Sequence, residues 1–287
     1  MPELPEVEIV KRSLLKTVNK AKIIDIKINN KNLRYKLSYK LLTQIINKKI
    51  LKISRRSKYL IFHFQHFLLL IHLGMTGKFL ITRKRDKLII KTSFYYDLNI
   101  LPKHNHIHFT LNNGLILIYN DVRRFGFFKL YKIKEIEEIS FLKKLGPEPL
   151  SHNFNENYFH KFIKNKKKNI KNLLMDQSFV SGLGNIYVNE VLFISKIHPL
   201  RSCKKINISE IKKLVFNIKK ILKTSISKGG SSIKDFGNIE GQKGQFQQHF
   251  HVYGKENTIC SRISCAGKIK KISISGRSSF YCTICQA

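Results

Sequence analysis

Four cysteines close to the C-terminus constrain the fold of this chain more than any other feature. They follow the pattern Cys260-x4-Cys265-x16-Cys282-x2-Cys285. Two close pairs on either side of a hairpin-length spacer predict a zinc ribbon that holds one Zn²⁺ ion. Because four thiolates complete a tetrahedral shell, no ligand position is left for water, and the metal is expected to be structural.

The placement of the cysteines also indicates the compartment. Four of the five lie within the last 28 residues, which favours metal binding in a reducing, cytoplasmic environment over a disulfide framework. The fifth, Cys203, is interpreted as a packed thiol, and His249 and His251 are alternative ligands to Cys260. The acidic N-terminus does not resemble a signal peptide. The most apolar run, 59–75, is interrupted by polar residues, so we expect no membrane span.

Charge predicts the kind of partner. Lys and Arg number 54 against 18 Asp and Glu, which gives a formal net charge of +36. This excess indicates a polyanion, and nucleic acid is favoured over an anionic membrane surface. Lys, Ile and Asn are abundant throughout the chain, a pattern typical of genomic nucleotide bias, which can inflate the Lys count without selection for binding. The sign of the charge is therefore more informative than its size.

Periodicity predicts two different halves. Short runs with alternating apolar residues indicate strands of an antiparallel sandwich; they are 23–28, 50–53, 59–64, 67–73, 79–82, 106–111, 115–119 and 127–131. Residues 83–103 are expected to form a charged loop. Helical spacing then appears in 156–175, 186–197 and 208–227. We expect a β domain over 1–145, a linker over 146–150, a helical domain over 151–250 and a zinc module over 251–287.

The first eight residues, MPELPEVE, offer chemistry. Removal of Met1 would leave Pro2 with a secondary amine, which can attack an electrophilic carbon and form an iminium. Glu3 follows directly and could carry protons. Pro5 and Glu6 suit the first turn of a helix, so a purely structural role is the alternative for the octapeptide alone.

This octapeptide resembles the start of the formamidopyrimidine-DNA glycosylase family. The resemblance implies an α+β multidomain fold: an N-terminal β-sandwich with a terminal helix, then a helix–two-turn–helix domain with a zinc hairpin. It also implies a bifunctional DNA glycosylase and AP lyase that excises oxidised purines (8-oxoguanine and formamidopyrimidines) from double-stranded DNA as a monomer, without a nucleotide cofactor. Pro2 would be the nucleophile, Glu3 the proton shuttle, Glu6 a supporting residue, and Lys58 an assistant in binding and strand cleavage.

Three further motifs match the same family. The stretch SGLGNIYVNE at 181–190 resembles its helix–two-turn–helix segment, with Asn185 on the DNA backbone. Lys171 matches a lysine that contacts the backbone near the damaged base. Arg277, between the cysteine pairs, matches the arginine that binds the phosphate beside the lesion, a task suited to the two-point geometry of guanidinium.

A last group concerns the gap that an extruded base leaves behind. In HLGMTG at 72–77 and NDVRRFG at 120–126, the residues that match the family's gap-filling side chains are Met75, Arg123 and Phe125. His104 and Arg124 are expected to contact DNA. Without the resemblance, Met75 and Phe125 would be interpreted as core residues.

The chain departs from the family at four places: the four-residue spacing between the first two cysteines, Asn172 and Val122 in place of prolines, and a longer loop at 82–102. Three alternatives stay open. The endonuclease VIII branch prefers oxidised pyrimidines but usually starts MPEGPE, and here residue 4 is Leu4. A non-catalytic DNA-binding module does not need Pro2 and Glu3. A basic zinc-ribbon RNA-binding protein leaves the octapeptide unexplained.

Overall fold

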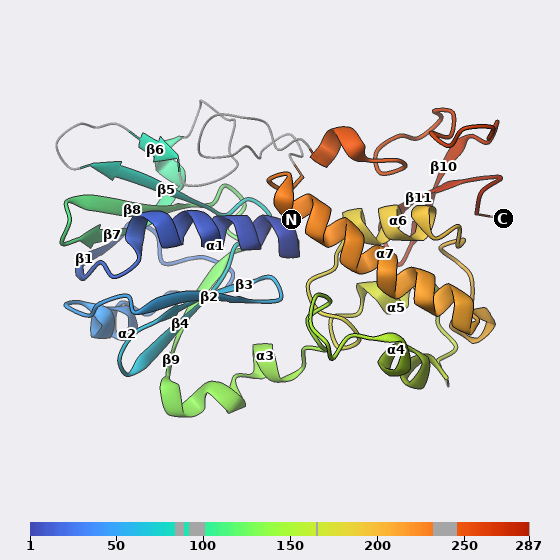
Figure 1. The fold of residues 1–287 in the computed structure, drawn as a ribbon. Helices are drawn as coiled ribbons and strands as arrows, with labels where there is room; N and C mark the ends of the chain where they lie inside the picture. The colour runs from blue at the N-terminus through green and yellow to red at the C-terminus, as the bar shows by residue number, and fades with distance from the viewer. Residues whose placement is uncertain (84–88, 92–100, 165, 232–245, 287) are drawn as a thin grey trace. The chain divides into compact units, whose positions relative to one another are not determined.

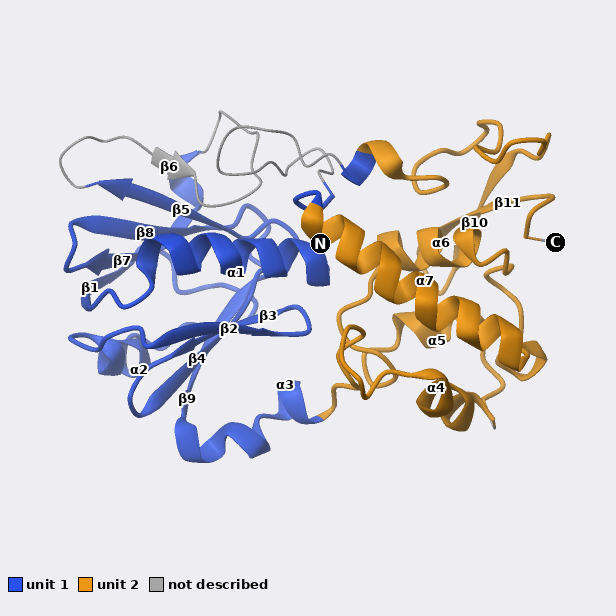
Figure 2. Cartoon of the chain, in the orientation of Figure 1, with its two compact units in different colours: residues 1–143, 228–247 blue, residues 144–227, 248–287 orange. Residues whose placement is uncertain are grey.

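The structure of the chain is a computed structural model that describes residues 1–83, 89–91, 101–164, 166–231 and 246–286. It divides into two compact units, each made from two segments of the sequence (Figure 2). Unit 1 comprises 1–143 and 228–247, and unit 2 comprises 144–227 and 248–287. The domain boundaries expected from the sequence stay a prediction.

Unit 1 is built on two antiparallel sheets (Figure 1). The five-stranded sheet has the order β1-β7-β8-β5-β6, with β1 at Ile23–Ile28, β7 at Asn105–Leu111, β8 at Leu115–Asn120, β5 at Lys78–Arg83 and β6 at Ile89–Lys91. The four-stranded sheet has the order β2-β3-β4-β9, with β2 at Lys52–Arg56, β3 at Tyr59–His63, β4 at Phe67–His72 and β9 at Phe127–Lys132.

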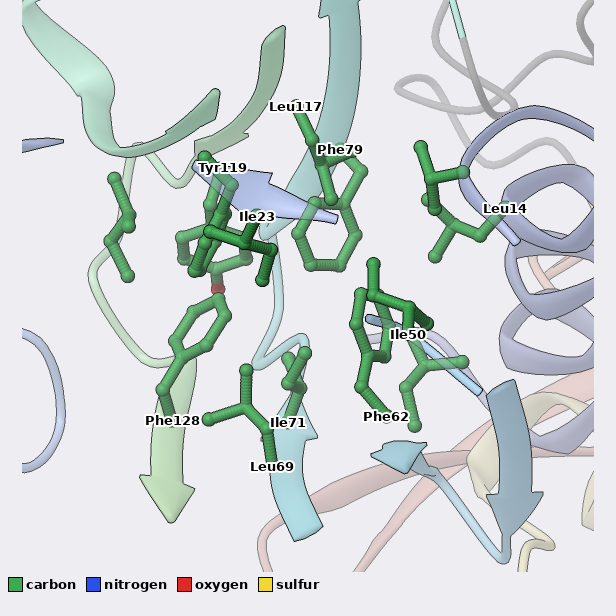
Figure 3. Packing of buried hydrophobic residues seen from close by; sticks show 14 of the residues in the cluster. Leu14, Ile23, Ile50, Phe62, Leu69, Ile71, Phe79, Leu117, Tyr119 and Phe128 are labelled. Carbon is green, nitrogen blue, oxygen red and sulfur yellow. The ribbon is translucent and has the colours of Figure 1, made fainter. Parts of the chain in front are cut away.

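A continuous apolar core lies between these sheets and the N-terminal helix. Figure 3 shows Phe79 and Tyr119 from the five-stranded sheet facing Phe62 and Ile71 from the four-stranded sheet, with Leu14 from the helix closing one side. All five side chains are at most 2% exposed. Burial of apolar area on this scale is the main stabilising contribution to the unit. The predicted sandwich is confirmed.

Helix α1, Leu4–Val18, begins where the sequence predicts it. Glu3 is the N-cap, Pro5 occupies the first turn, and the Glu3 N–H donates to Glu6 Oε2 at 2.9 Å in a capping box. Short elements complete unit 1: the helices α2 at Tyr39–Leu42 and α3 at Ser140–Lys143, and the 3₁₀ turns η1 at Thr43–Ile45, η2 at Pro102–His104 and η3 at Ile133–Glu138.

One strand prediction and one loop prediction are wrong in their bounds. The second strand covers Lys52–Arg56 and not 50–53, because Ile50 bonds to the segment after α1: its N–H donates to Ala21 and its carbonyl accepts from Lys20. The expected 83–103 loop contains the short strand β6, which pairs with β5. The rest of that predicted loop, 84–88 and 92–100, lies outside the described residues.

Unit 2 is mainly helical. Its helices are α4 at Glu156–Ile163, α5 at Ile170–Met175, α6 at Asn185–Ile194 and α7 at Ile208–Ser227, with 3₁₀ turns η4 at Cys203–Lys205 and η5 at Phe246–His249. The last of these turns crosses the division between the units. The helical stretch expected over 156–175 is divided into α4 and α5, because Asn169 caps a new helix by accepting the Asn172 N–H at 2.8 Å. The helix over 208–227 is confirmed.

The C-terminal module is a hairpin of β10, Ile269–Ile274, and β11, Arg277–Cys282. Its two turn residues, Ser275 and Gly276, have φ values of 49° and 71°. Positive φ at both central positions is the geometry of a tight hairpin turn whose twist matches the strands. Arg277 is therefore the first residue after the turn and is exposed. Among the described residues, no helix combines the length and apolarity that crossing a bilayer requires.

Candidate active site and nucleic-acid interface

The predicted nucleophile lies at a buried corner of unit 1. Pro2 is buried, and Glu3 beside it is 2% exposed. Glu6 organises this corner with both carboxylate oxygens: Oε2 accepts the Glu3 N–H, and Oε1 accepts the Ser231 N–H at 2.9 Å and its hydroxyl at 2.8 Å. We call Glu3, Glu6 and Ser231 the Glu6 corner. Its geometry holds the backbone that follows Pro2 in one position.

Arg55 connects the N-terminal helix to the turn that carries Lys58. Its Nε donates to Glu8 Oε2 at 3.0 Å, and its guanidinium also donates to the Ser57 carbonyl at 2.8 Å. Burial alone would raise the pKa of Glu8, but hydrogen bonds from Lys11 and Arg55 outweigh it and lower that pKa. Lys58 is only 7% exposed in this two-residue turn between β2 and β3. The predicted assistant is thus fixed relative to α1.

The predicted gap-filling residues lie on two loops of unit 1. Met75 is 36% exposed and Phe125 is 43% exposed, although both are large and apolar. The Arg123 guanidinium lies 4.7 Å from the centre of the Phe125 ring, a cation–π arrangement. Arg123 and Phe125, together with Arg34 and Arg124, line an open pocket on the surface of unit 1. Exposed apolar side chains next to arginines suit insertion into a base stack.

Two histidines support these loops. Burial lowers the pKa of His72 to about 4, with Lys58 and Arg34 acting in the same direction, so the ring is neutral near pH 7. Its Nδ1 accepts the Gly74 N–H at 3.0 Å, directly before Met75. The partly exposed His104 accepts the Asp121 N–H through its carbonyl at 3.1 Å.

In unit 2, the predicted DNA contacts converge on one carbonyl. The Ser278 carbonyl accepts from Lys171 Nζ at 3.0 Å and from Asn185 Nδ2 at 2.9 Å. We call Lys171, Asn185 and Ser278 the Ser278 corner. Lys171 is 1% exposed, and burial, aided by Arg277, lowers its pKa to about 8. These contacts fix the hairpin residue directly after Arg277.

The four predicted metal ligands are gathered at the base of the hairpin. Their sulfur atoms all lie within 4.8 Å of one another, and Cys260 to Cys285 and Cys265 to Cys282 are 3.8 and 3.7 Å apart. Tetrahedral coordination with metal–sulfur bonds of about 2.3 Å requires sulfurs about 3.8 Å apart, so the donor set fits one ion. The alternative ligand His251 instead contacts Ser261. Cys203 is buried away from the cluster, as expected.

Three further residues of these sites were not predicted. Ser231 lies 225 positions from Glu6, so no local pattern connects them. Glu190 accepts three N–H groups from residues 251–253 and thereby attaches the chain before the first cysteine to α6. Asp121 is completely buried between the two gap loops. An acidic residue next to two arginines in so basic a chain was the available signal for Asp121.

Comparison with known proteins finds two family models that match successive parts of the chain. Residues 1–128 match the formamidopyrimidine-DNA glycosylase N-terminal domain, and residues 145–237 match the formamidopyrimidine-DNA glycosylase H2TH domain. A formamidopyrimidine-DNA glycosylase of Roseobacter denitrificans is 40% identical over 287 residues and is matched over the full length of both chains.

Two solved structures of the Lactococcus lactis Fpg protein are also similar. A mutant in complex with Fapy-dG-containing DNA has a TM-score of 0.87 and 37% identity over 99% of each chain. The wild-type protein in complex with an oxidised-pyrimidine-containing DNA has a TM-score of 0.85 and 36% identity, again over 99% of each chain. Both similarities extend over sandwich, helices and cysteine hairpin together.

Proposed function

The chain belongs to the formamidopyrimidine-DNA glycosylase family, and from that premise we propose that Pro2 is its nucleophile and Glu3 its proton shuttle. The protein is a bifunctional enzyme of base excision repair, a DNA glycosylase and AP lyase. The observation that carries the proposal is the Glu6 corner, which fixes the backbone of Glu3 directly after Pro2.

The reaction needs a free amine at Pro2, so Met1 must be removed. The nitrogen attacks C1′ of the damaged nucleotide, and the bond from C1′ to the base breaks, so that the base leaves with the bonding electron pair and takes up a proton. The nitrogen then loses its proton, and the bond from C1′ to the ring oxygen opens as Glu3 delivers a proton to that oxygen, which leaves an iminium. The iminium acidifies the C2′ proton, whose loss expels the 3′ phosphate; a second elimination releases the 5′ phosphate.

Glu6 and Lys58 have supporting roles in this proposal. Glu6 has both oxygens engaged by Glu3 and Ser231, so we assign it to orientation of the site. Lys58 is held on the turn that Arg55 connects to α1. Its cation would disfavour protonation of the Pro2 amine and bind a phosphate of the cleaved strand.

We assign DNA-backbone contacts to residues of both units. Arg277 is exposed at the start of β11 and would bind the phosphate beside the lesion. Lys171 and Asn185 support that hairpin through Ser278 and would complete the phosphate site. In unit 1, His104 and Arg124 would contact the backbone. The partner is damaged double-stranded DNA, which the enzyme binds as a monomer.

Met75, Arg123 and Phe125 would fill the space left by the extruded base. Met75 and Phe125 are exposed, whereas a core role would bury them, and the Arg123 guanidinium lies over the Phe125 ring. The ion in the cysteine cluster would be Zn²⁺ with a structural role, since thiolates complete its shell. A reducing, cytoplasmic location with activity at the nucleoid suits four metal-binding thiols.

The test is covalent trapping. Borohydride should reduce the iminium to a stable adduct between the enzyme and a duplex that carries 8-oxoguanine or an abasic site. Peptide mapping should then place the adduct on residue 2 of a chain that lacks Met1. If the adduct maps to Lys58, the nucleophile is this lysine in the β2–β3 turn and not Pro2, because a lysine amine can form the same imine.

An endonuclease VIII-like preference for oxidised pyrimidines is a second candidate. The observation that favours it is that the Lactococcus lactis relative was solved with an oxidised-pyrimidine-containing DNA. We propose oxidised purines as the main substrate because the chain has Leu4 in the octapeptide. Excision rates on matched duplexes, one with 8-oxoguanine and one with an oxidised thymine, distinguish the two; faster excision of the pyrimidine would favour the second candidate.

A further inference from the structure

The two loops that carry the proposed gap-filling residues touch each other through their backbones. We call residues 73–77 the Met75 loop and residues 121–126 the Arg123 loop. Gly74 has a φ of +65°, and a Cβ atom there would lie 2.4 Å from the Gly126 nitrogen and 2.5 Å from the Phe125 carbonyl carbon. No side chain fits at that distance. Neither loop can therefore move toward the other without displacing it.

The Asp121 carboxylate lies beneath this contact and bonds to both loops. It is 0% exposed. Oδ1 accepts the Thr76 hydroxyl at 2.5 Å, from the Met75 loop. Oδ2 accepts the Gly126 N–H at 2.8 Å, from the end of the Arg123 loop, and the Tyr119 hydroxyl at 3.2 Å. Three donors satisfy this carboxylate, as burial of such a group requires.

Thr76 extends the connection to the side chains that would enter DNA. Its hydroxyl donates to Asp121 and accepts the Arg123 N–H at 3.0 Å, so it uses both of its hydrogen-bonding functions. The backbone of the Arg123 loop also folds back on itself, because the Arg124 N–H donates to the Asp121 carbonyl at 3.3 Å with φ at +56°. Met75 thus directly precedes Thr76, and Arg123 bonds to the Thr76 hydroxyl through its own N–H.

We propose that Asp121 is a positioning residue that makes the Met75 loop and the Arg123 loop a single rigid insertion element. This inference rests on the proposed gap-filling roles of Met75, Arg123 and Phe125. The energetic argument is that a wedge can offset the cost of base extrusion only if it is held in place before it enters the stack. Two independent loops would lose conformational freedom on insertion, whereas a prefixed pair would not.

The chemistry of the group makes the proposal specific. A carboxylate offers acceptors on both oxygens, whereas an asparagine amide would turn an NH₂ group toward either the Thr76 hydroxyl or the Gly126 N–H. Asp121→Asn therefore keeps the shape of the side chain, but it either opposes two donors at Gly126 or forces the Thr76 hydroxyl to turn its proton away from residue 121. Thr76→Val removes the bridge from the other side, and Thr76→Ser retains it.

The test compares extrusion-dependent and extrusion-independent reactions in the full-length enzyme. In Asp121→Asn, excision of 8-oxoguanine from a duplex should slow by roughly tenfold to a hundredfold, as expected for a disrupted buried hydrogen-bond pair. Cleavage of a preformed abasic site should change by less than about threefold, since no base must leave the stack. Fluorescence of 2-aminopurine opposite the lesion should show reduced gap filling. Thr76→Ser, which keeps the hydroxyl that bonds to both Asp121 and the Arg123 N–H, is the matched control, expected within about threefold of wild type on both substrates.

Met75→Ala separates this inference from the proposed function. If Met75→Ala slows excision and Asp121→Asn does not, the inference is overturned while the gap-filling role stands. If Met75→Ala has no effect, the gap-filling assignment fails; slow excision in Asp121→Asn alone would then also overturn the inference.

An equal loss of activity in Asp121→Asn on duplex and abasic substrates would indicate a general structural role for Asp121 and contradict the inference. If Asp121→Asn does not fold, Thr76→Val and Thr76→Ser decide: slow excision in the first with wild-type excision in the second supports the proposal.

Discussion

The Glu6 corner of unit 1 and the Ser278 corner of unit 2 solve opposite electrostatic problems. In unit 1, a carboxylate is buried and gathers backbone N–H groups and a hydroxyl. In unit 2, a backbone carbonyl gathers an amide and a buried ammonium. Both corners fix a residue beside the one that would touch DNA, Pro2 in the first and Arg277 in the second.

Charges of opposite sign have different uses in the two corners. Acidic residues are only 18 against 54 basic ones, yet three of them, Glu3, Glu6 and Glu8, are buried in the first turns of α1. Anions near the amine can move protons, whereas cations on the hairpin can hold phosphate. Changes at the Glu6 corner should therefore alter the chemical step, and changes at the Ser278 corner should alter DNA affinity.

The largest expected effect is a single residue added before Pro2. The nitrogen then becomes an amide without a usable lone pair, so strand cleavage should fall by on the order of a thousandfold or more. Affinity for a duplex with an abasic-site analogue should stay within about threefold. Single-turnover kinetics and a filter-binding titration measure the two quantities. Undiminished cleavage would contradict the role of Pro2 and the division between the corners.

Glu3→Gln should separate the two activities of the enzyme. Removal of a proton shuttle typically costs about a hundredfold to ten-thousandfold, and we expect base excision to fall by that much. A preformed abasic site should still be cut within about tenfold of the wild-type rate, because its sugar already opens to the aldehyde without a proton from Glu3. Equal losses on both substrates would mean that Glu3 serves structure through its capping of α1. The capping variant Glu3→Asp provides the comparison.

Loss of the metal should weaken DNA binding by unit 2 and leave the Glu6 corner of unit 1 unchanged. In Cys282→Ser/Cys285→Ser the ion can no longer be held, so the hairpin that presents Arg277 loses its base, and DNA affinity should fall at least about tenfold. Elemental analysis of the native protein should give one zinc per chain. Cys203→Ser is the matched control, since that thiol lies outside the cluster. Full DNA affinity in the double variant would refute the structural role of the ion.

Arg277→Ala should weaken binding without changing discrimination between damaged and intact DNA, because a phosphate contact carries no base information. If about five phosphates are neutralised, log K should fall with log salt at a slope of about −4 to −5. Loss of one phosphate contact in the variant should make this slope less steep by about 0.9. Lys270→Ala removes an equal charge from an exposed position on β10 of the same hairpin. If both variants have an equal effect, Arg277 contributes only one positive charge to the hairpin and no specific phosphate contact.

The two corners also differ in how much of them the sequence could predict. Strands such as Ile23–Ile28 and the helix over 208–227 follow from periodicity, because each buries one face locally. The cysteine cluster follows from spacing. The Glu6–Ser231 bond and the convergence on Ser278 depend on residues far apart in the chain, and no local pattern carries them. The octapeptide and the arginine motif predict which residues would react or bind phosphate, but not which residues hold them in place.

The smallest expected effect is the pH dependence that Lys171 gives to binding. Its pKa is lowered from 10.5 to about 8, so the folded chain holds this proton less tightly than the unfolded chain. Its contribution to stability therefore rises with pH between about 8 and 10.5. DNA affinity should change in the opposite direction, because a nearby phosphate favours the ammonium: it should fall by a few-fold, and at most about tenfold, from pH 7 to 9. Lys171→Arg keeps its charge over this range and should flatten the profile, whereas Glu6→Gln should leave it unchanged. An identical fall in Lys171→Arg would mean that other groups titrate, and that the Ser278 corner acts through geometry alone.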